Sequence, residues 1–338
     1  MKTLVLPDNK PHRLAFYLAM EEFAAHELPS NEYFFAWRVP PTVICGRNQD
    51  IEKEVDLAYC NAEGIDVVRR RSGGGCVYAD MNNLMFSYIT PGSEVVTTFS
   101  QYTAMLSAML RSLGFDAAAT GRNDILIGGR KVSGNAFYRL SDRSIVHGTM
   151  LYEIDFERMA KAITPSRAKL ESKAVKSVQS HITCLKTEGL TMPIEEFCLY
   201  AVNYLTDGEP IHLSQEQVTC IEQFEQLYYD VEYINRRRPS GNASLSTKIA
   251  DVEINSRIDG VGEFSVSIWL DNNHRITEMN LAGDFFVLSN LEESITNKLK
   301  GTEFSPESVM TALININTST VIAGLSNEMF LNLLFNSI

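Results

Sequence analysis

Three arginines followed by three glycines form the stretch of this chain whose residue types best suit an anion. Residues 67–80 read VVRRRSGGGCVYAD, so the arginines directly precede Ser72 and Gly73 to Gly75. Glycine lacks a Cβ, so the run can adopt positive φ and let an anionic ligand touch backbone N–H groups. Guanidinium forks suit phosphate or carboxylate. A glycine-rich hairpin with a solvated basic flank explains the pattern equally well, and both interpretations stay open.

Two common glycine motifs are excluded by the residues around this run. The Walker A motif needs a Lys-Ser or Lys-Thr pair after the glycines, and the dinucleotide fingerprint needs G-x-G-x-x-G at the start of a helix. Neither pattern is present here, and the residues from Cys76 to Tyr78 indicate a strand instead.

A lysine behind a glycine turn is the second chemical feature. Residues 120–136 read TGRNDILIGGRKVSGNA, which predicts strand, Gly-Gly turn and strand. Lys131 follows the turn, and the small residues behind it leave room for a ligand. A third stretch, His147-Gly148-Thr149, lies further along the chain.

The order and spacing of these three stretches resemble those of the lipoate–protein ligases, in the larger family shared with biotin–protein ligases and octanoyltransferases. The resemblance continues through residues 170–178 (LESKAVKSV) and 283–286 (GDFF), so it covers most of the chain. It implies an α+β fold: a large domain with mixed or antiparallel β-sheets flanked by helices, plus a smaller C-terminal α/β accessory domain. We expect the lipoate- and ATP-binding catalytic domain to span residues 1–247 and the accessory domain residues 248–338.

The resemblance also implies a reaction in two steps. The lipoate carboxylate attacks the α-phosphate of ATP, which gives lipoyl-AMP and pyrophosphate, with Mg²⁺ as cofactor. A lysine of an acceptor lipoyl domain then attacks the mixed anhydride. The implied acceptors are 2-oxo acid dehydrogenase acyltransferase subunits, the glycine-cleavage carrier protein, or both. Both steps need positioning and stabilised charge at the α-phosphate, and the sequence does not choose between lipoate and octanoate.

Lys131 is the expected catalytic residue, because by analogy it contacts both the α-phosphate and the lipoyl carbonyl oxygen. A lone lysine after a turn is usually a solvated surface residue, but the motif around it favours the functional role. By the same resemblance, the residues expected to bind ATP or lipoyl-AMP are Arg70, Ser72, Gly73, Gly74, Gly75, Cys76, Val77, Tyr78, Asn123, Asp124, Lys131, Ser133, Gly134, His147, Gly148 and Thr149.

Two of these residues keep a second interpretation. Asp124 is the candidate ligand for Mg²⁺, which prefers one or two carboxylates plus phosphate oxygens. It is as readily a strand-end aspartate that bonds its own turn. His147 is either a direct ligand contact or a histidine satisfied inside the core. The lipoyl tail needs a hydrophobic slot, for which the candidates are Val77, Val132, Ala136 and Met150.

The sequence departs from the family pattern at three places. Cys76 stands where alanine is usual, Ala79 stands where histidine is usual, and residues 233–245 lack the usual tryptophan-rich run. Two alternative functions therefore remain: an octanoyl or lipoyl transferase with a cysteine nucleophile, and a non-catalytic paralogue that binds lipoyl-AMP or a lipoyl domain. Pyrophosphate release from ATP that depends on lipoate separates the ligase from both.

The composition of the chain argues against some classes of binding partner and indicates its cellular compartment. The 338 residues are 45% hydrophobic and 21% charged, with a net charge of −12. Such an acidic chain lacks the broad basic face of a nucleic-acid binder. No apolar run approaches the length of about 18 residues that a transmembrane helix needs, and the first nine residues lack a signal-peptide core. Six scattered cysteines without a C-x-x-C pair predict reduced thiols and a cytoplasmic protein.

Apolar periodicity and turn residues predict the elements that position these side chains. We expect Asp8 or Asn9 to cap the first helix and Thr97 or Thr98 to cap the third. The expected helices cover 11–28, 51–63, 97–113, 155–163, 193–205, 214–228, 289–300, 305–314 and 326–335. The expected strands cover 33–37, 42–45, 65–69, 76–79, 83–89, 116–120, 123–127, 130–139, 144–153, 263–270 and 275–282, and a polar linker covers 236–242.

Overall fold

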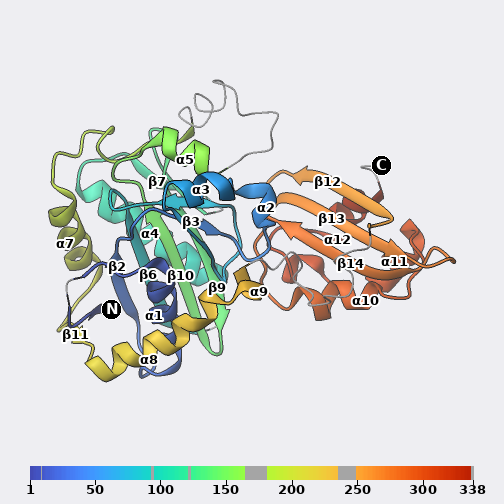
Figure 1. Cartoon of the computed structure of the whole chain (residues 1–338), viewed down its shortest axis with the longest axis horizontal. Coiled ribbons are helices and arrows are strands. Elements are labelled where there is room, and N and C mark those ends of the chain that lie inside the picture. The colour runs from blue at the N-terminus through green and yellow to red at the C-terminus, as the bar shows by residue number, and fades with distance from the viewer. Residues whose placement is uncertain (9, 93–94, 121–122, 164–180, 235–248, 336–338) are drawn as a thin grey trace. The chain divides into compact units, whose positions relative to one another are not determined.

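The chain forms two units, each built around a β-sheet (Figure 1). This computed structural model describes residues 1–8, 10–92, 95–120, 123–163, 181–234 and 249–335. The first unit comprises Met1–Cys45, Glu52–Arg70 and Cys76–Ile234, and the second comprises Gly46–Ile51, Arg71–Gly75 and Asn235–Ile338. The motif at 170–178, the linker at 236–242 and the candidate cap Asn9 lie outside the described residues.

The first unit contains an eight-stranded sheet with the order β11-β1-β2-β6-β10-β9-β8-β7. β1 runs parallel to β2 and β11, and the other neighbours are antiparallel. The sheet is therefore mixed, as expected. Its strands are β1 (Lys2–Val5), β2 (Tyr33–Trp37), β6 (Leu84–Pro91), β7 (Ala117–Ala119), β8 (Asp124–Ile127), β9 (Arg130–Leu140), β10 (Arg143–Met150) and β11 (Ile211–His212).

Helices cover both faces of this sheet. Because side chains alternate along a strand, β9 points Tyr138 toward helix α1 and Phe137 toward helix α4, where it contacts Phe99. Helix α8 packs beside α1, and its N-terminus has a capping box in which Ser214 and Gln217 bond reciprocally. The helices are α1 (Leu14–His26), α3 (Leu57–Ala62), α4 (Val95–Ser112), α5 (Phe156–Ala162), α7 (Ile194–Leu205), α8 (Gln215–Glu225) and α9 (Val231–Ile234), with a 3₁₀ turn η2 (Gln226–Tyr229).

A smaller sheet carries the arginine motif. Its strands are β4 (Asp66–Arg69), β3 (Thr42–Cys45) and β5 (Val77–Ala79), with β3 in the middle. Ile44, Val68 and Ala79 join the same core cluster as the apolar residues of α1. This packing fixes the ends of β4 and β5, between which the glycine run lies.

The second unit has an antiparallel sheet of β12 (Val252–Ile258), β13 (Gly262–Leu270) and β14 (Ile276–Gly283). Its core cluster includes Phe264, Ile268 and Phe330. The α+β prediction, with a smaller α/β unit near the C-terminus, is thus confirmed. Its helical segments are α2 (Ile51–Glu54, of which Ile51 belongs to this unit), a π-helical turn η4 (Glu292–Thr296), α10 (Asn297–Leu299), α11 (Pro306–Ala312), a 3₁₀ turn η5 (Thr318–Thr320) and α12 (Asn327–Phe335).

The predicted continuous helix over 51–63 is wrong. The chain leaves the helical path at Val55, which forms a bridge with Ile163. The N–H of Asp56 donates to the carbonyl of Ala162, and its carboxylate accepts from the N–H of Tyr59. Asp56 therefore caps a new helix, α3, and ends the possibility of one long helix.

Two predicted caps need correction, and three strands were not predicted. Asp8 bonds His12 rather than a helix terminus, and α1 begins after Arg13, which provides no side-chain cap. Thr97 and Thr98 lie inside α4 rather than at its cap. The short or solvent-facing strands β1, β11 and β12 have no predicted counterpart.

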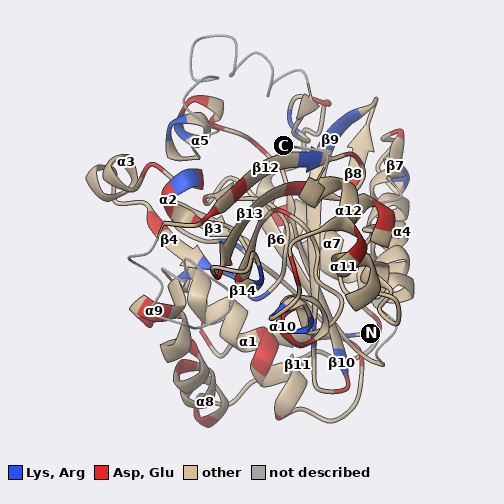
Figure 2. Ribbon diagram, turned by 90° about the vertical axis from the view of Figure 1, so that its right-hand side faces the viewer, with Lys and Arg blue, Asp and Glu red and all other residues tan. Residues whose placement is uncertain are grey.

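Charged residues of both signs occur along the described ribbon. Figure 2 shows acidic and basic residues interspersed along the described ribbon. Among the described residues, no helix combines the length and apolar character needed to cross a membrane.

Candidate functional site

The β8–β9 hairpin brings a lysine and a carboxylate together. Gly128 and Gly129 form its turn with φ of 56° and 79°, the left-handed values that favour glycine in two-residue hairpins. A register shift between Ile125 and Leu126 interrupts the ladder. Across it, the Lys131 ammonium lies 2.7 Å from Oδ1 of Asp124, with both side chains about one third exposed (33% and 28%). The lysine is thus aimed by an ion pair rather than free in solvent.

Gly134 makes room for this lysine. A Cβ at Gly134 would lie 2.7 Å from Cε and 2.8 Å from Nζ of Lys131, which is closer than side-chain atoms approach. The lysine side chain therefore lies across the glycine. This contact gives a physical reason for a glycine three residues after the lysine.

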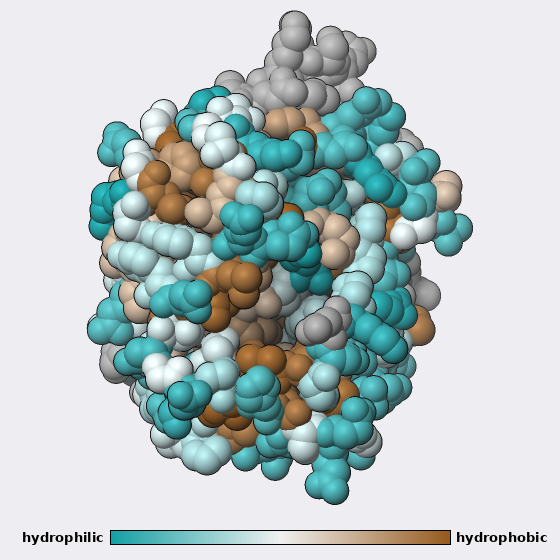
Figure 3. All heavy atoms as spheres, turned by 90° about the vertical axis from the view of Figure 1, so that its left-hand side faces the viewer, coloured by the Kyte–Doolittle hydropathy of each residue, from teal (hydrophilic) through white to brown (hydrophobic). Residues whose placement is uncertain are grey.

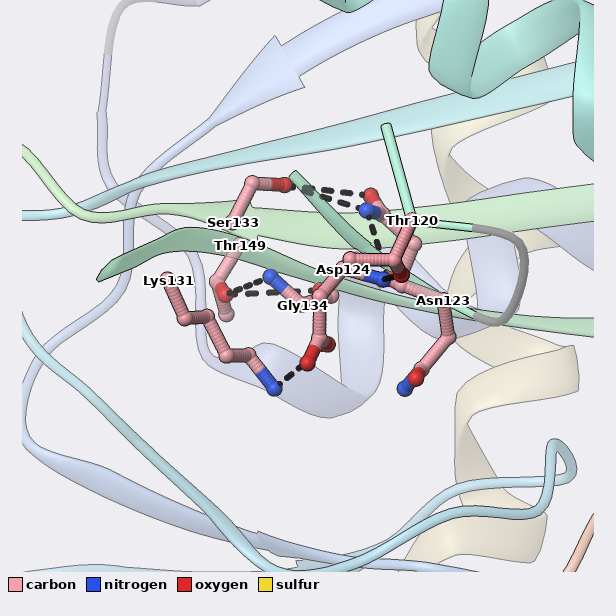
Figure 4. A network of polar contacts seen from close by, with 8 residues as sticks. Thr120, Asn123, Asp124, Lys131, Ser133, Gly134 and Thr149 are labelled. Atoms are coloured by element: carbon pink, nitrogen blue, oxygen red, sulfur yellow. Dashed lines mark hydrogen bonds and ion pairs between the residues drawn. The ribbon is translucent and has the colours of Figure 1, made fainter. Parts of the chain in front are cut away.

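Buried amides and hydroxyls hold the hairpin beneath the ion pair (Figure 4). Asn135 Nδ2 donates to Ser133 Oγ and to the carbonyl of Asn123, both at 3.1 Å. Thr149 Oγ1 lies 3.4 Å from both the N–H and the carbonyl of Gly134. In this view the side chains of Asn123, Asp124 and Lys131 extend in the same direction, away from the network.

Gly148 is required by the same network. It pairs with Asn135 across β10 and β9, and a Cβ there would overlap Oδ1 of Asn135. A larger residue at this position would push the amide away from Ser133. Gly148 therefore supports the site through Asn135, a residue that the sequence motifs do not mark as functional.

The segment after the motif at 170–178 flanks Lys131. The N–H of Thr183 donates to the carbonyl of Lys131 at 2.8 Å, and Ile182 forms a parallel bridge with Lys131. The carboxylate of Glu188 accepts from Thr183 Oγ1 and pairs with Arg130. The backbone of Lys131 is thus held by β8 on one side and by residues 182–183 as well.

His147 lies inside the core beside a buried carboxylate. Its Nδ1 is 2.9 Å from both oxygens of Glu21, whose side chain is fully buried in α1. Ser87 and Tyr138 also donate to Glu21, at 2.6 and 3.2 Å, and Trp37 donates to Ser87 at 2.9 Å. This favours the core interpretation of His147, and direct ligand contact stays a prediction. Glu21 was not predicted from the sequence, although the pair of carboxylates within the otherwise apolar run 14–25 is a signal that points to it.

The end of β4 places Arg70 in a buried position. Its N–H donates to the carbonyl of Cys45 at 2.9 Å, and its guanidinium donates to the carbonyl of Ile44 at 3.0 Å. Burial lowers the pKa of Arg70 to about 10, so the group remains charged at neutral pH. Val77 and Tyr78 follow on β5, with Tyr78 buried.

Cys76 contacts a second thiol. Its Sγ lies 3.4 Å from Sγ of Cys45. The hydrogen bond to Cys45, together with burial, raises the pKa of the Cys76 thiol. A thiol with a raised pKa is a poor nucleophile, which argues against the transferase alternative.

The glycine run belongs to the second unit. Of its three glycines, only Gly74 uses the positive φ (91°) that the run can adopt, and Gly73 and Gly75 do not. Gly73 needs its small size instead, because a Cβ would overlap the carbonyl oxygen of Phe285. The N–H of Gly74 lies 3.4 Å from that same oxygen. The carbonyl oxygen of buried Ser72 accepts from the N–H of Arg47 at 2.9 Å.

The structure therefore gathers the expected site residues into separate groups. One network contains the residues of the hairpin and of β10 that contact one another: Asn123, Asp124, Lys131, Ser133, Gly134, Gly148 and Thr149. His147 contacts Glu21 on the α1 face of the same sheet. Arg70, Cys76, Val77 and Tyr78 lie at the small sheet. Ser72 and Gly73 to Gly75 are described within the second unit.

A cavity of about 460 Å³ opens on the first unit between the N-terminal strand, the end of β2 and α7. Figure 3 shows hydrophobic side chains gathered around a hollow on this face. Trp37, Tyr17 and Leu199 are among its lining residues. None of the four residues expected to line the lipoyl slot lines this cavity: Val77, Val132, Ala136 and Met150.

Family models match both parts of the chain. The model described as the lipoyl protein ligase A/B catalytic domain matches residues 13–206, and that of the bacterial lipoate protein ligase C-terminus matches residues 250–334. Lipoate–protein ligase 1 of Staphylococcus aureus is 34% identical, over 84% of this chain and 85% of its own length. The chain belongs to the lipoate–protein ligase family.

Other members of the family are similar over nearly the whole length. The probable lipoate–protein ligase A of Mycoplasma pneumoniae is 29% identical over 100% of this chain and 99% of its own. Lipoate–protein ligase LplJ of Bacillus subtilis is 29% identical over 94% and 96%. The crystal structure of P. falciparum LipL1 in complex with lipoate shares the fold, with a TM-score of 0.74, 21% identity and coverage of 98% and 97%.

Proposed function

We propose that this chain is an ATP-dependent lipoate–protein ligase. It activates lipoate as lipoyl-AMP and transfers the lipoyl group to a lysine of an acceptor lipoyl domain. The observation that carries the proposal is the ammonium of Lys131, held 2.7 Å from Asp124 across the bare backbone of Gly134. A positioned cation of this kind stabilises charge that develops on an α-phosphate. Relatives named lipoate–protein ligase, which align over most of this chain, support the same reaction.

In the first step, Lys131 stabilises the α-phosphate while the lipoate carboxylate attacks it and pyrophosphate leaves. Arg70 supplies a second cation, which is buried, and the backbone from Ser72 to Tyr78 is proposed to contact the nucleotide. In the second step, Lys131 stabilises the lipoyl carbonyl oxygen as the acceptor lysine attacks. Neither step requires a covalent enzyme intermediate, in keeping with the raised pKa of Cys76.

Asp124 fits the single protein carboxylate that Mg²⁺ needs when phosphate oxygens fill its other positions. Its side chain is 28% exposed and faces the same side of the hairpin as Lys131. Mg²⁺ bound there would neutralise charge on the phosphates of ATP. The domain roles are also part of the proposal: residues 1–247 catalyse and residues 248–338 assist. The proposal also includes a cytoplasmic location, which suits six free cysteines. The proposed acceptors are the lipoyl domains of 2-oxo acid dehydrogenase acyltransferase subunits, the glycine-cleavage carrier protein, or both.

The test is lipoate-dependent release of pyrophosphate from ATP, followed by mass measurement of an acceptor lipoyl domain. We expect pyrophosphate only when lipoate or octanoate is present, and a lipoyl mass increase on the acceptor lysine. Parallel reactions with octanoate define the acyl preference, and parallel acceptors define the partner. A chain that binds lipoyl-AMP but releases no pyrophosphate from ATP and lipoate would be the non-catalytic paralogue instead.

A further inference from the structure

Two cysteines face each other where the arginine–glycine motif begins and ends. Cys45 is the last residue of β3, and Cys76 directly precedes β5. Ile44 pairs with Val77 in the antiparallel ladder, so the two cysteines occupy the next cross-strand position. Their sulfur atoms lie 3.4 Å apart, and all six cysteines are free thiols.

The geometry suits a disulfide. Directly opposed residues of antiparallel strands have Cβ atoms about 4.5–5.5 Å apart, close to the range of about 3.5–4.5 Å that a disulfide requires. The sulfur atoms need to approach by only about 1.4 Å to reach bonding distance. A rotamer adjustment of one side chain and a small shift of the backbone at the end of β5 supply such a movement.

The surroundings assign different roles to the two thiols. Cys76 is partly exposed, whereas Cys45 is fully buried. The hydrogen bond from Cys76 and the nearby charges of Arg69 and Arg70 lower the pKa of the Cys45 thiol, despite its burial. A small oxidant therefore reaches Cys76 first. Cys45, whose pKa is lowered, is the thiol that attacks the oxidised sulfur of Cys76.

We propose that Cys45 and Cys76 are a redox-modification site, which small organic disulfides convert to a disulfide that slows the ligase. The Cys76 thiol first passes its proton across the hydrogen bond to Cys45, and the Cys76 thiolate attacks glutathione disulfide, which forms a mixed disulfide and releases one glutathione. The Cys45 thiolate then attacks the Cys76 sulfur and expels the second glutathione. Two thiols are oxidised, one glutathione disulfide is reduced to two glutathione molecules, and each thiol loses one proton.

Oxidation should slow the reaction because both cysteines adjoin the motif. Segment 46–51 of the second unit begins directly after Cys45, and segment 71–75 of the same unit ends directly before Cys76, so a bond between the cysteines ties one end of each segment. Cys45 also accepts the backbone N–H of Arg70. A shift of about 1 Å at a positioned group can cost up to about a hundredfold in rate. We expect at least about a tenfold loss of adenylate formation. This effect on rate rests on the proposed ligase function.

The experiment treats the full chain with glutathione disulfide, maps disulfides by peptide mass spectrometry, and measures lipoate-dependent pyrophosphate release before and after dithiothreitol. We expect a Cys45–Cys76 disulfide, loss of rate, and recovery on reduction. Each variant is compared with its own reduced form. Cys76→Ala should keep its rate under oxidant, and Cys45→Ser should retain glutathione on Cys76. Cys220→Ser, which removes a thiol of similar exposure on α8, should respond like the wild type.

Three results would overturn the proposal: free thiols at both positions after oxidation, a mixed disulfide on Cys76 that never resolves in the wild type, or a disulfide without loss of rate. Equal inhibition of Cys76→Ala would do the same, because the inhibition would then come from another thiol. If the reduced chain releases no pyrophosphate, the ligase function fails, while the peptide map alone still decides whether the thiol pair forms a disulfide.

Discussion

Replacing Gly134 with alanine should disable the ligase without unfolding it. The new Cβ would lie 2.7 Å from Cε and 2.8 Å from Nζ of Lys131, whereas ordinary contacts begin at 3.4 Å. The end of the lysine must therefore move by about 0.7 Å, which breaks its alignment with Asp124 and the α-phosphate. Since about 1 Å of misplacement can cost a hundredfold, we expect adenylation to fall about 10- to 100-fold, or about 1.4–2.7 kcal/mol.

Stability should change little in this variant, because the displaced atoms are the far end of a flexible side chain. Alanine is also favoured over glycine in a strand by about 0.5–1 kcal/mol. The assay is single-turnover pyrophosphate release with excess enzyme, alongside thermal unfolding. The matched controls are Lys131→Ala and the double variant. Because Gly134→Ala acts through the lysine, it should add nothing once the lysine is removed. Wild-type rates in the single variant, or a further loss in the double variant, would refute this reasoning.

Four other outcomes are expected from the structure. Lys131→Ala should abolish detectable adenylate while leaving the unfolding temperature nearly unchanged, and near-wild-type pyrophosphate release would contradict its assignment. Asp124→Asn should raise the Mg²⁺ concentration for half-maximal rate, because the carboxylate is lost while the side-chain shape remains; an unchanged Mg²⁺ titration would remove it as the metal ligand. Glu21→Gln should destabilise the fold by about 2–4 kcal/mol in urea, since one of the two buried acceptor oxygens that His147 and two hydroxyls contact becomes an amide donor and the negative charge is lost; a loss below about 0.5 kcal/mol would show that this network contributes little. Burial raises the pKa of Cys60 to about 11, so only about one thousandth of this thiol is ionised at pH 8, and alkylation of the native protein should spare it until the pH approaches 11.

The local chemistry of the motifs could be predicted from the sequence because it depends on neighbouring residues. The Gly-Gly turn before Lys131 requires left-handed φ, which glycine alone adopts readily, and the hairpin forms where the pattern predicts it. Alternating apolar residues predict β13, and the strand forms where the pattern lies. These features need no information about distant parts of the chain.

Elements stabilised mainly by distant partners escaped prediction. β1 is four residues long and β11 only two, and they form by pairing with each other and with β2. The break between α2 and α3 depends on Ile163, which lies more than a hundred residues along the chain from Val55. No local pattern carries such information, because tertiary pairing overrides helix propensity.

The sequence by itself determined the family and the expected reaction, and it predicts the lysine at the centre of that reaction, because motif residues and their spacing are written along the chain. Only the tertiary structure decided what each motif residue does in the fold. It showed that Gly134 accommodates the lysine side chain, that Gly148 protects the amide of Asn135, and that His147 faces the buried carboxylate of Glu21. It also placed Cys45 beside Cys76, thirty-one residues apart. Such contacts are decided by which strands pair and which faces meet, and these depend on the packing of the whole core.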